Sequence, residues 1–91
     1  MRTIEKKVWP FYFEQIYKGN KSFEVRLGDE SYDEGDELWL REWDPKTNDY
    51  TGQSIKRTIG FVLNTKELKF WPKSDVQKYG FVIISLLSTK E

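Results

Sequence analysis

Three charged side chains that could bind a polar ligand follow a glycine at position 19. They belong to the run Gly19-x-Lys21-x-Phe23-Glu24-x-Arg26, in which polar and apolar residues alternate. If the run is a strand, Glu24 and Arg26 share one face about 7 Å apart, because each strand residue advances about 3.3 Å. A carboxylate, a guanidinium and the Lys21 ammonium suit a phosphate-bearing or nucleotide-like ligand. The alternative is a solvated strand face, where each contact contributes at most about 1 kcal/mol.

Aromatic rings alternate with an arginine further along the chain. Trp39, Arg41 and Trp43 fall on one face of a run whose other face carries Leu38 and Leu40. Exposed rings interleaved with arginine suit single-stranded nucleic acid, because each stacked base contributes about 1 to 3 kcal/mol. Packing against a helix would explain the same tryptophans, so both interpretations stay open.

A third candidate is the polar stretch from residue 65 to residue 79. Four lysines there face two acids, a local excess of positive charge that could contact RNA: Lys66, Lys69, Lys73 and Lys78 against Glu67 and Asp75. A connection of this length is often functional or contains a short helix. The alternative is a solvated loop whose Phe70 and Trp71 plug one end of a barrel.

The composition narrows the chemistry. The 91 residues include 15 basic and 15 acidic side chains and no histidine or cysteine. Zinc sites, disulfides, thiol nucleophiles and imidazole bases are therefore excluded. The acids between residues 29 and 37 do not follow the calcium-loop pattern, so we expect no metal and no cofactor. No apolar run approaches 18 residues, so we expect a cytoplasmic protein that does not span a membrane.

The elements that must position these side chains are short. Apolar alternation predicts strands at residues 3–9, 22–27, 36–43, 53–64 and 81–87, and a long hairpin loop at 44–52 makes two of them antiparallel. Pro10 and Gly19 bound a two-turn helix. Aromatic residues, 16% of the chain, can supply the core of one domain spanning residues 1–91. The pattern predicts a mainly β, α+β fold of about five to six mostly antiparallel strands, closed into a small barrel.

Short motifs follow one another between residues 7 and 64. They are Trp9-Pro10-x-x-Phe13-x-x-Ile16-x-x-Gly19-x-Lys21-x-Phe23-Glu24-x-Arg26, then Gly35-Asp36, Glu42-Trp43-Asp44-Pro45 and Tyr50-Thr51-Gly52. Together they resemble a small bacterial and phage family of unknown function in the ASCH group (activating-signal-cointegrator homology). The resemblance implies a PUA-like β-barrel that binds RNA in a cleft lined by Lys21, Glu24 and Arg26.

We therefore expect a binding module for RNA or a nucleotide-like ligand rather than an enzyme, with Trp39, Arg41 and Trp43 as further contacts. Some ASCH proteins are hydrolases that use a lysine with a threonine nucleophile. Lys21 matches that lysine, whereas Glu24 stands where the threonine would be. A small hydrolase acting on modified nucleosides through Lys21 is the alternative, and a protein-interaction domain is a further one.

Overall fold

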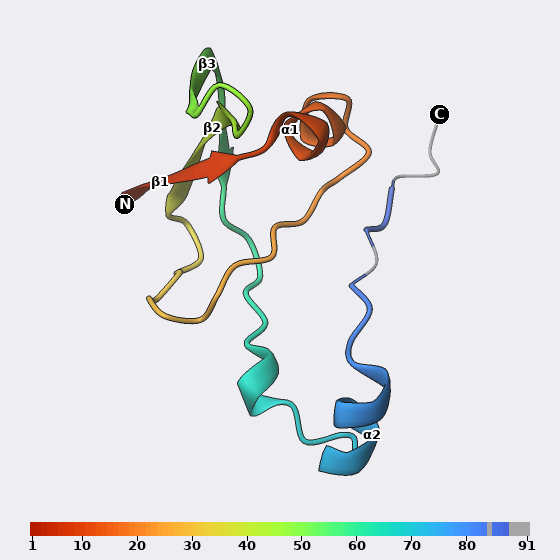
Figure 1. Ribbon diagram of the computed structural model, residues 1–91. Coiled ribbons are helices and arrows are strands. Elements are labelled where there is room, and N and C mark those ends of the chain that lie inside the picture. The colour runs from red at the N-terminus through yellow and green to blue at the C-terminus, as the bar shows by residue number, and fades with distance from the viewer. Residues whose placement is uncertain (84, 88–91) are drawn as a thin grey trace.

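Three strands form one mixed sheet with β2 at its centre (Figure 1). The computed structural model describes residues 1–83 and 85–87. Its elements are β1 (Thr3–Val8), α1 (Pro10–Tyr17), β2 (Glu37–Asp44), β3 (Asp49–Thr58), the 3-10 helix η1 (Thr65–Glu67) and α2 (Lys73–Tyr79). The α+β class predicted from the sequence is confirmed.

The two strand pairings of the sheet differ in direction. β2 and β3 are antiparallel and joined by the predicted hairpin, in which Asn48 has a positive φ of 58°. β1 instead runs parallel to β2, with Thr3 opposite Glu37 and Val8 opposite Glu42. Parallel neighbours need a crossover between the end of one strand and the start of the next. Residues 9–36 supply it.

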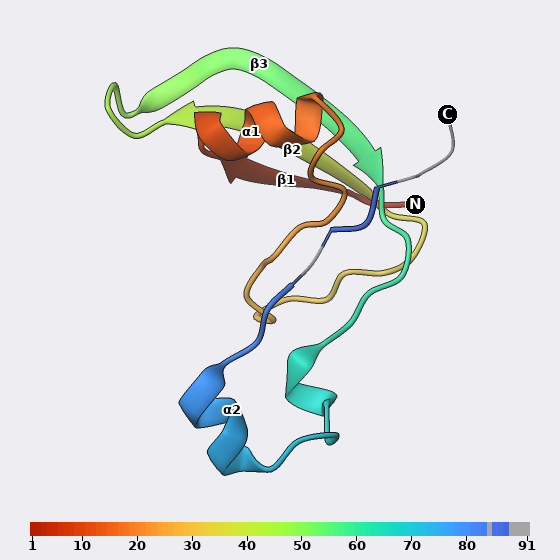
Figure 2. The same cartoon turned by 90° about the vertical axis from the view of Figure 1, so that its right-hand side faces the viewer.

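The core lies between α1 and one face of the sheet (Figure 2). Pro10 begins the helix, and Gly19 follows its end with a φ of +84°, which a residue without Cβ adopts at no steric cost. Phe13 and Ile16 are buried against Val8 of β1 and Leu40 of β2. The predicted helix and first strand are thus confirmed, and Leu40 is the most deeply buried side chain of the described core.

The ladder between β2 and β3 is irregular next to this core. Arg41 pairs with Ser54 and Trp43 pairs with Tyr50, so β3 has two more residues than β2 across this step. Gly52, with a φ of +99°, lies within the insertion. Gly60, which falls inside the strand predicted at residues 53–64, instead follows the end of β3.

The described chain has fewer strands than the sequence predicted. Residues 22–27 and the described parts of 81–87 form no strand, and β3 ends at Thr58 instead of reaching residue 64; position 84 lies outside the described residues. Val25 and Leu27 were predicted to be buried, but they are 61% and 79% exposed. The charged side of this run turns inward instead, where Glu24 pairs with Lys21 and Arg26.

Residues 61–83 form a second lobe that hangs away from the sheet in both ribbon views (Figures 1 and 2). It contains η1 and α2, so residues 65–79 contain a short helix, which was one of the two possibilities given for this stretch. Phe70 and Trp71 stack edge to face and are 75% and 54% exposed, so they plug no barrel end. The part of the chain that the structure describes contains no helix long and apolar enough to cross a membrane.

Asp36 fastens the beginnings of β1 and β2 together. Its carboxylate accepts hydrogen bonds from the backbone N–H of Arg2 at 3.0 Å and from the Arg2 guanidinium at 3.3 Å. Its backbone carbonyl accepts from the N–H of Ile59 after β3. The Arg2 backbone N–H, followed by the nearby guanidinium charge, holds the pKa of Asp36 below its ordinary value.

Asp36→Asn should therefore lower the stability of the fold at neutral pH. The variant should also lose less stability than the wild type as the pH falls, because it lacks the titrating carboxylate. A depressed folded-state pKa gives stability that is fully present above the ordinary value of 3.8 and is lost as pH falls through the folded value. Thermal unfolding followed by circular dichroism from pH 7 to pH 3 would measure this. A difference between variant and wild type that stays constant over this range would contradict the assignment.

Candidate functional site

The segment between α1 and β2 follows the free edge of β1 and carries the predicted site. It contains no helix or strand, and side-chain contacts attach it to β1 and its flank. These contacts are Arg26 Nη2 to the Lys7 carbonyl at 3.0 Å, Lys6 Nζ to Glu30 at 2.5 Å and Arg2 Nη2 to the Ser31 carbonyl at 2.6 Å. Polar side chains thus replace the backbone ladder that a strand would have made.

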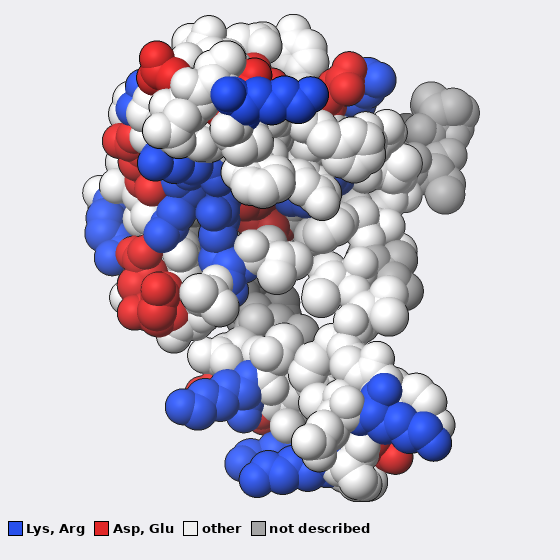
Figure 3. Space-filling view, viewed as in Figure 1, with Lys and Arg blue, Asp and Glu red and all other residues white. Residues whose placement is uncertain are grey.

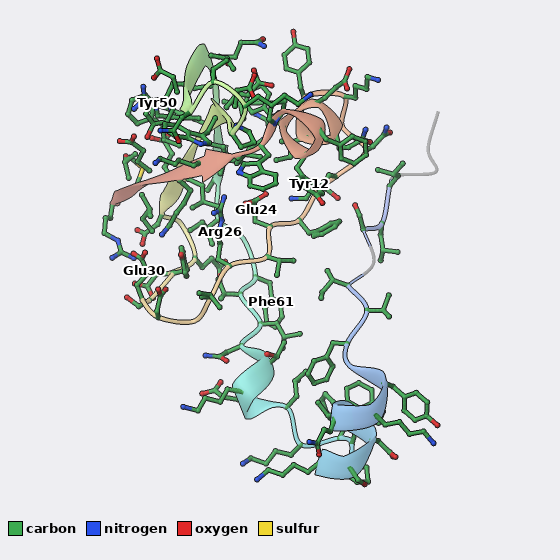
Figure 4. The ribbon with its side chains drawn as sticks, in the orientation of Figure 1. Tyr12, Glu24, Arg26, Glu30, Tyr50 and Phe61 are labelled. Atoms are coloured by element: carbon green, nitrogen blue, oxygen red, sulfur yellow. The ribbon has the colours of Figure 1, made fainter. Side chains whose placement is uncertain are left out.

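Lys21, Glu24 and Arg26, the residues predicted to share a site, are in direct contact; we call them the charged triad. Lys21 Nζ donates to Glu24 Oε1 at 2.5 Å and to the Phe23 carbonyl at 2.8 Å. Arg26 Nε and Nη2 lie 3.0 and 2.9 Å from Glu24 Oε2. Figure 4 shows Glu24 and Arg26 side by side below β1 and α1. One carboxylate therefore fixes two cations.

The triad is not a solvated strand face, which was the alternative interpretation. The side chains of Lys21 and Glu24 are each 15% exposed, and that of Arg26 is 26% exposed. Two cations and one carboxylate leave an excess of one positive charge. In a partly buried position that charge is screened less by salt than an exposed one. The arrangement can attract an anion whose phosphate reaches the Arg26 guanidinium.

The two hydroxyls that could act as nucleophile with Lys21, those of Ser22 and Thr51, hydrogen-bond to other groups. The hydroxyl of Ser22 contacts the hydroxyl of Ser85 at 3.0 Å and the Leu86 carbonyl at 3.4 Å. The hydroxyl of Thr51 donates to Glu42. Neither hydroxyl hydrogen-bonds to Lys21, which is paired with Glu24. The contacts of Ser85 also bring the chain after α2 back beside residues 20–22.

Trp39, Arg41 and Trp43 lie on the sheet face away from α1, and all three are half-buried. The Arg41 guanidinium lies 3.7 Å from the ring centroid of Tyr50 and forms a 2.7 Å ion pair with Glu5. Trp43 packs edge-on against Tyr50, with ring centroids 5.0 Å apart. We call this surface, formed by Trp39, Arg41, Trp43 and Tyr50, the aromatic face. Its rings pack against Arg41 and Lys7, whereas α1 packs against the opposite face of the sheet.

Lys7 connects the aromatic face to the charged triad. Its carbonyl accepts the Arg26 hydrogen bond, while its ammonium lies 3.8 Å from the ring centroid of Trp43. In Figure 3, Lys and Arg atoms run across the sheet lobe where Figure 1 places β1, with acidic atoms beside them. Cations and aromatic rings therefore lie together beside β1. The lysines of residues 65–79 are exposed on the other lobe.

Lys6 and Glu30 form a separate ion pair beside the triad. The hydrogen bond from Lys6 holds the pKa of Glu30 below its usual value, and the same bond, with one from Lys6 to the Tyr32 hydroxyl, raises the pKa of Lys6. Both shifts favour the charged forms. The pair is neutral as a whole, and it attaches the acidic loop to β1.

Sequence reasoning missed Glu42, a buried carboxylate on the α1-facing side of β2. It is 7% exposed and accepts hydrogen bonds at Oε1 from the Thr51 hydroxyl at 2.6 Å and the Gln53 amide at 3.0 Å. The insertion in β3 brings both donors to the same residue. The sequence did contain a signal for this position. Glu42 continues the alternation of Leu38 and Leu40, so it falls on the same face of the strand as these leucines.

The structure is thus a small α+β chain with a charged triad beside a mixed sheet. The chain belongs to the family described as Domain of unknown function (DUF3850), which matches residues 3–86. No curated protein and no solved structure matches the chain. Within residues 1–83 and 85–87, no three acidic side chains are grouped so that they could hold a metal ion.

Glu24→Gln should destabilise the protein by about 1 to 3 kcal/mol, because two partly buried cations lose their charged partner. Glu14→Gln is the matched control. It breaks the Glu14–Lys18 pair, whose side chains are both more than half exposed, and should cost about 0.5 kcal/mol or less. Urea unfolding at pH 7 measures both. Equal costs would contradict the role of Glu24 as the partner of Lys21 and Arg26.

Proposed function

We propose that the protein is a cytoplasmic, non-enzymatic binding module for RNA or a nucleotide-like ligand, with the charged triad as its anion site. The observation that carries the proposal is the Glu24 carboxylate bound to both Lys21 and Arg26. Folding itself orients these cations, so ligand binding need not order them. Preorganisation of this kind improves affinity because less side-chain entropy is lost on binding.

Each member of the triad has a distinct role in the proposal. Arg26 uses Nε and Nη2 toward Glu24 and Lys7, which leaves its Nη1 edge for a phosphate or a base edge. Glu24 orients Arg26 and can accept a hydrogen bond from an exocyclic amine. Lys21, held by Glu24, supplies a point charge. The triad thus recognises an anion with a hydrogen-bonding base attached.

The aromatic face supplies the second element of the proposal. Trp39 and Trp43 are half-buried, so part of each ring system is in contact with solvent. Bases that stack there would compete with the cations already over the rings, Lys7 over Trp43 and Arg41 near Trp39. A released Lys7 or Arg41 would then meet the phosphates of the same strand.

The proposal includes an ASCH-type, PUA-like barrel as the complete fold. Two features support it. Residues 21–27 already follow the free edge of β1 through Arg26, and Ser85 already contacts Ser22 and Asn20. Backbone pairing of these two segments next to β1 would enlarge the three-stranded sheet toward closure and cover Val25 and Leu27. Closure would also remove the free edge of β1.

A protein-interaction domain is the second candidate, favoured by the exposed aromatic side chains of the α2 lobe. Trp71 lies 6.0 Å from Phe81 between ring centroids, and both line an open pocket of about 310 Å³ together with Tyr79. This candidate requires no affinity of the triad for phosphate. The RNA experiment below therefore separates the two functions.

Arg26→Ala should weaken binding of a short single-stranded RNA about tenfold at low salt and reduce the salt slope. One phosphate contact on a single strand corresponds to a slope of about 0.7 in log K against log salt. Fluorescence anisotropy titrations at two salt concentrations measure both quantities. A nucleoside monophosphate, compared with its nucleoside as competitor, shows whether the phosphate itself is bound.

The matched control is Lys46→Ala in the β2–β3 loop, which removes the same charge from an exposed position outside the triad. It should leave RNA affinity nearly unchanged. If the wild-type protein binds no RNA or nucleotide at low salt, the proposed function is wrong. If Lys46→Ala and Arg26→Ala weaken binding equally, the attraction is general and the triad is not its site.

A further inference from the structure

A second polar site lies on the α1-facing side of β2, at the buried carboxylate of Glu42. Both of its hydrogen-bond donors, the Thr51 hydroxyl and the Gln53 amide, bind Oε1. Both donors are neutral. Oε2 is left for a further partner.

Glu42 differs from the other buried acid of the described chain in having no cation. Asp36 is paired with Arg2 at 3.3 Å, whereas no described Lys or Arg lies within ion-pair distance of Glu42. A buried carboxylate without a cationic partner is costly, and neutral hydrogen bonds compensate only part of that cost. The position therefore favours an incoming positive charge.

An open pocket of about 340 Å³ leads to this carboxylate between α1 and the β2–β3 hairpin. Phe11, Phe13 and Tyr17 of α1 form its apolar wall, and Gln53 and Glu14 add polar groups. Among the described residues, no lysine or arginine lines it. Its volume is at the lower end of the range for small-molecule sites, so it fits a single ring or a short chain.

We propose that this pocket binds a small organic cation, an amidinium, guanidinium or primary ammonium group carried on an apolar body. The cation pairs with Glu42 Oε2, and the body lies against the rings of Phe11 and Tyr17, whose π faces also attract positive charge. The pocket shares no lining residue with the charged triad, and its charge preference is the reverse. The proposal is therefore independent of RNA binding.

Benzamidine and its neutral isostere benzamide test the charge requirement. Proton–nitrogen NMR titration of the full chain should show saturable shifts at the Gln53 side-chain amide with benzamidine, and affinity at least about tenfold weaker for benzamide. Glu42→Gln keeps the shape and the acceptor at Oε1 but removes the charge. It should abolish the preference for benzamidine. Equal affinities of the wild-type protein for the two compounds, or no binding of benzamidine, would overturn the proposal.

Two tyrosines of α1 give a test that does not alter the buried carboxylate. Tyr17 lines the pocket and Tyr12 does not, although both are more than half exposed. Tyr17→Ala should weaken benzamidine binding several-fold, about the effect of one cation–π contact, and Tyr12→Ala should leave it unchanged. Equal effects of the two substitutions would overturn the assignment of the pocket.

Discussion

The parallel pairing of β1 with β2 is the constraint on which the rest of the structure depends. Because β2 begins beside the start of β1, the chain must travel back along the sheet before β2 can form. The outward part of that path is α1, which covers the core at Val8 and Leu40. The return part carries the charged triad past the free edge of β1. The same topological requirement thus produces both the hydrophobic core and the proposed anion site.

Ion pairs hold three acids of the sheet lobe in place. Asp36 pairs with Arg2 and joins the starts of β1 and β2. Glu30 pairs with Lys6 and Glu24 pairs with Lys21, and both acids belong to the crossover between these strands. Of the two buried acids in the described part of the chain, Asp36 has a cation and Glu42 has only neutral donors. The zero net charge of the sequence therefore conceals two local exceptions of opposite sign, one at the triad and one beneath α1. A neutral chain can in this way offer sites to both anions and cations.

Local signals in the sequence predicted the elements whose contacts are near in the chain. Pro10 and Gly19 predicted the bounds of α1, and the alternation of Leu38 and Leu40 predicted β2. The polar loop at residues 44–52 predicted the hairpin between β2 and β3. The parallel pairing of β1 was not predictable, since it depends on contacts more than thirty residues apart. Alternation also misplaced residues 22–27, because it assumes that apolar residues turn inward. Here the ion pairs of Glu24 outweighed the burial of Val25 and Leu27, and no periodicity reveals that.

The most direct test of the account is the NMR signal of the Arg26 Nε–Hε group during titration with a short single-stranded RNA. The account predicts a resolved signal in the free protein, because Glu24 fixes the guanidinium before any ligand arrives. On addition of RNA, that signal should shift saturably at low salt and return as salt is raised. RNA binding that leaves the Arg26 signal unchanged, or an Arg26 signal indistinguishable from those of freely exposed arginines, would contradict a preformed anion site.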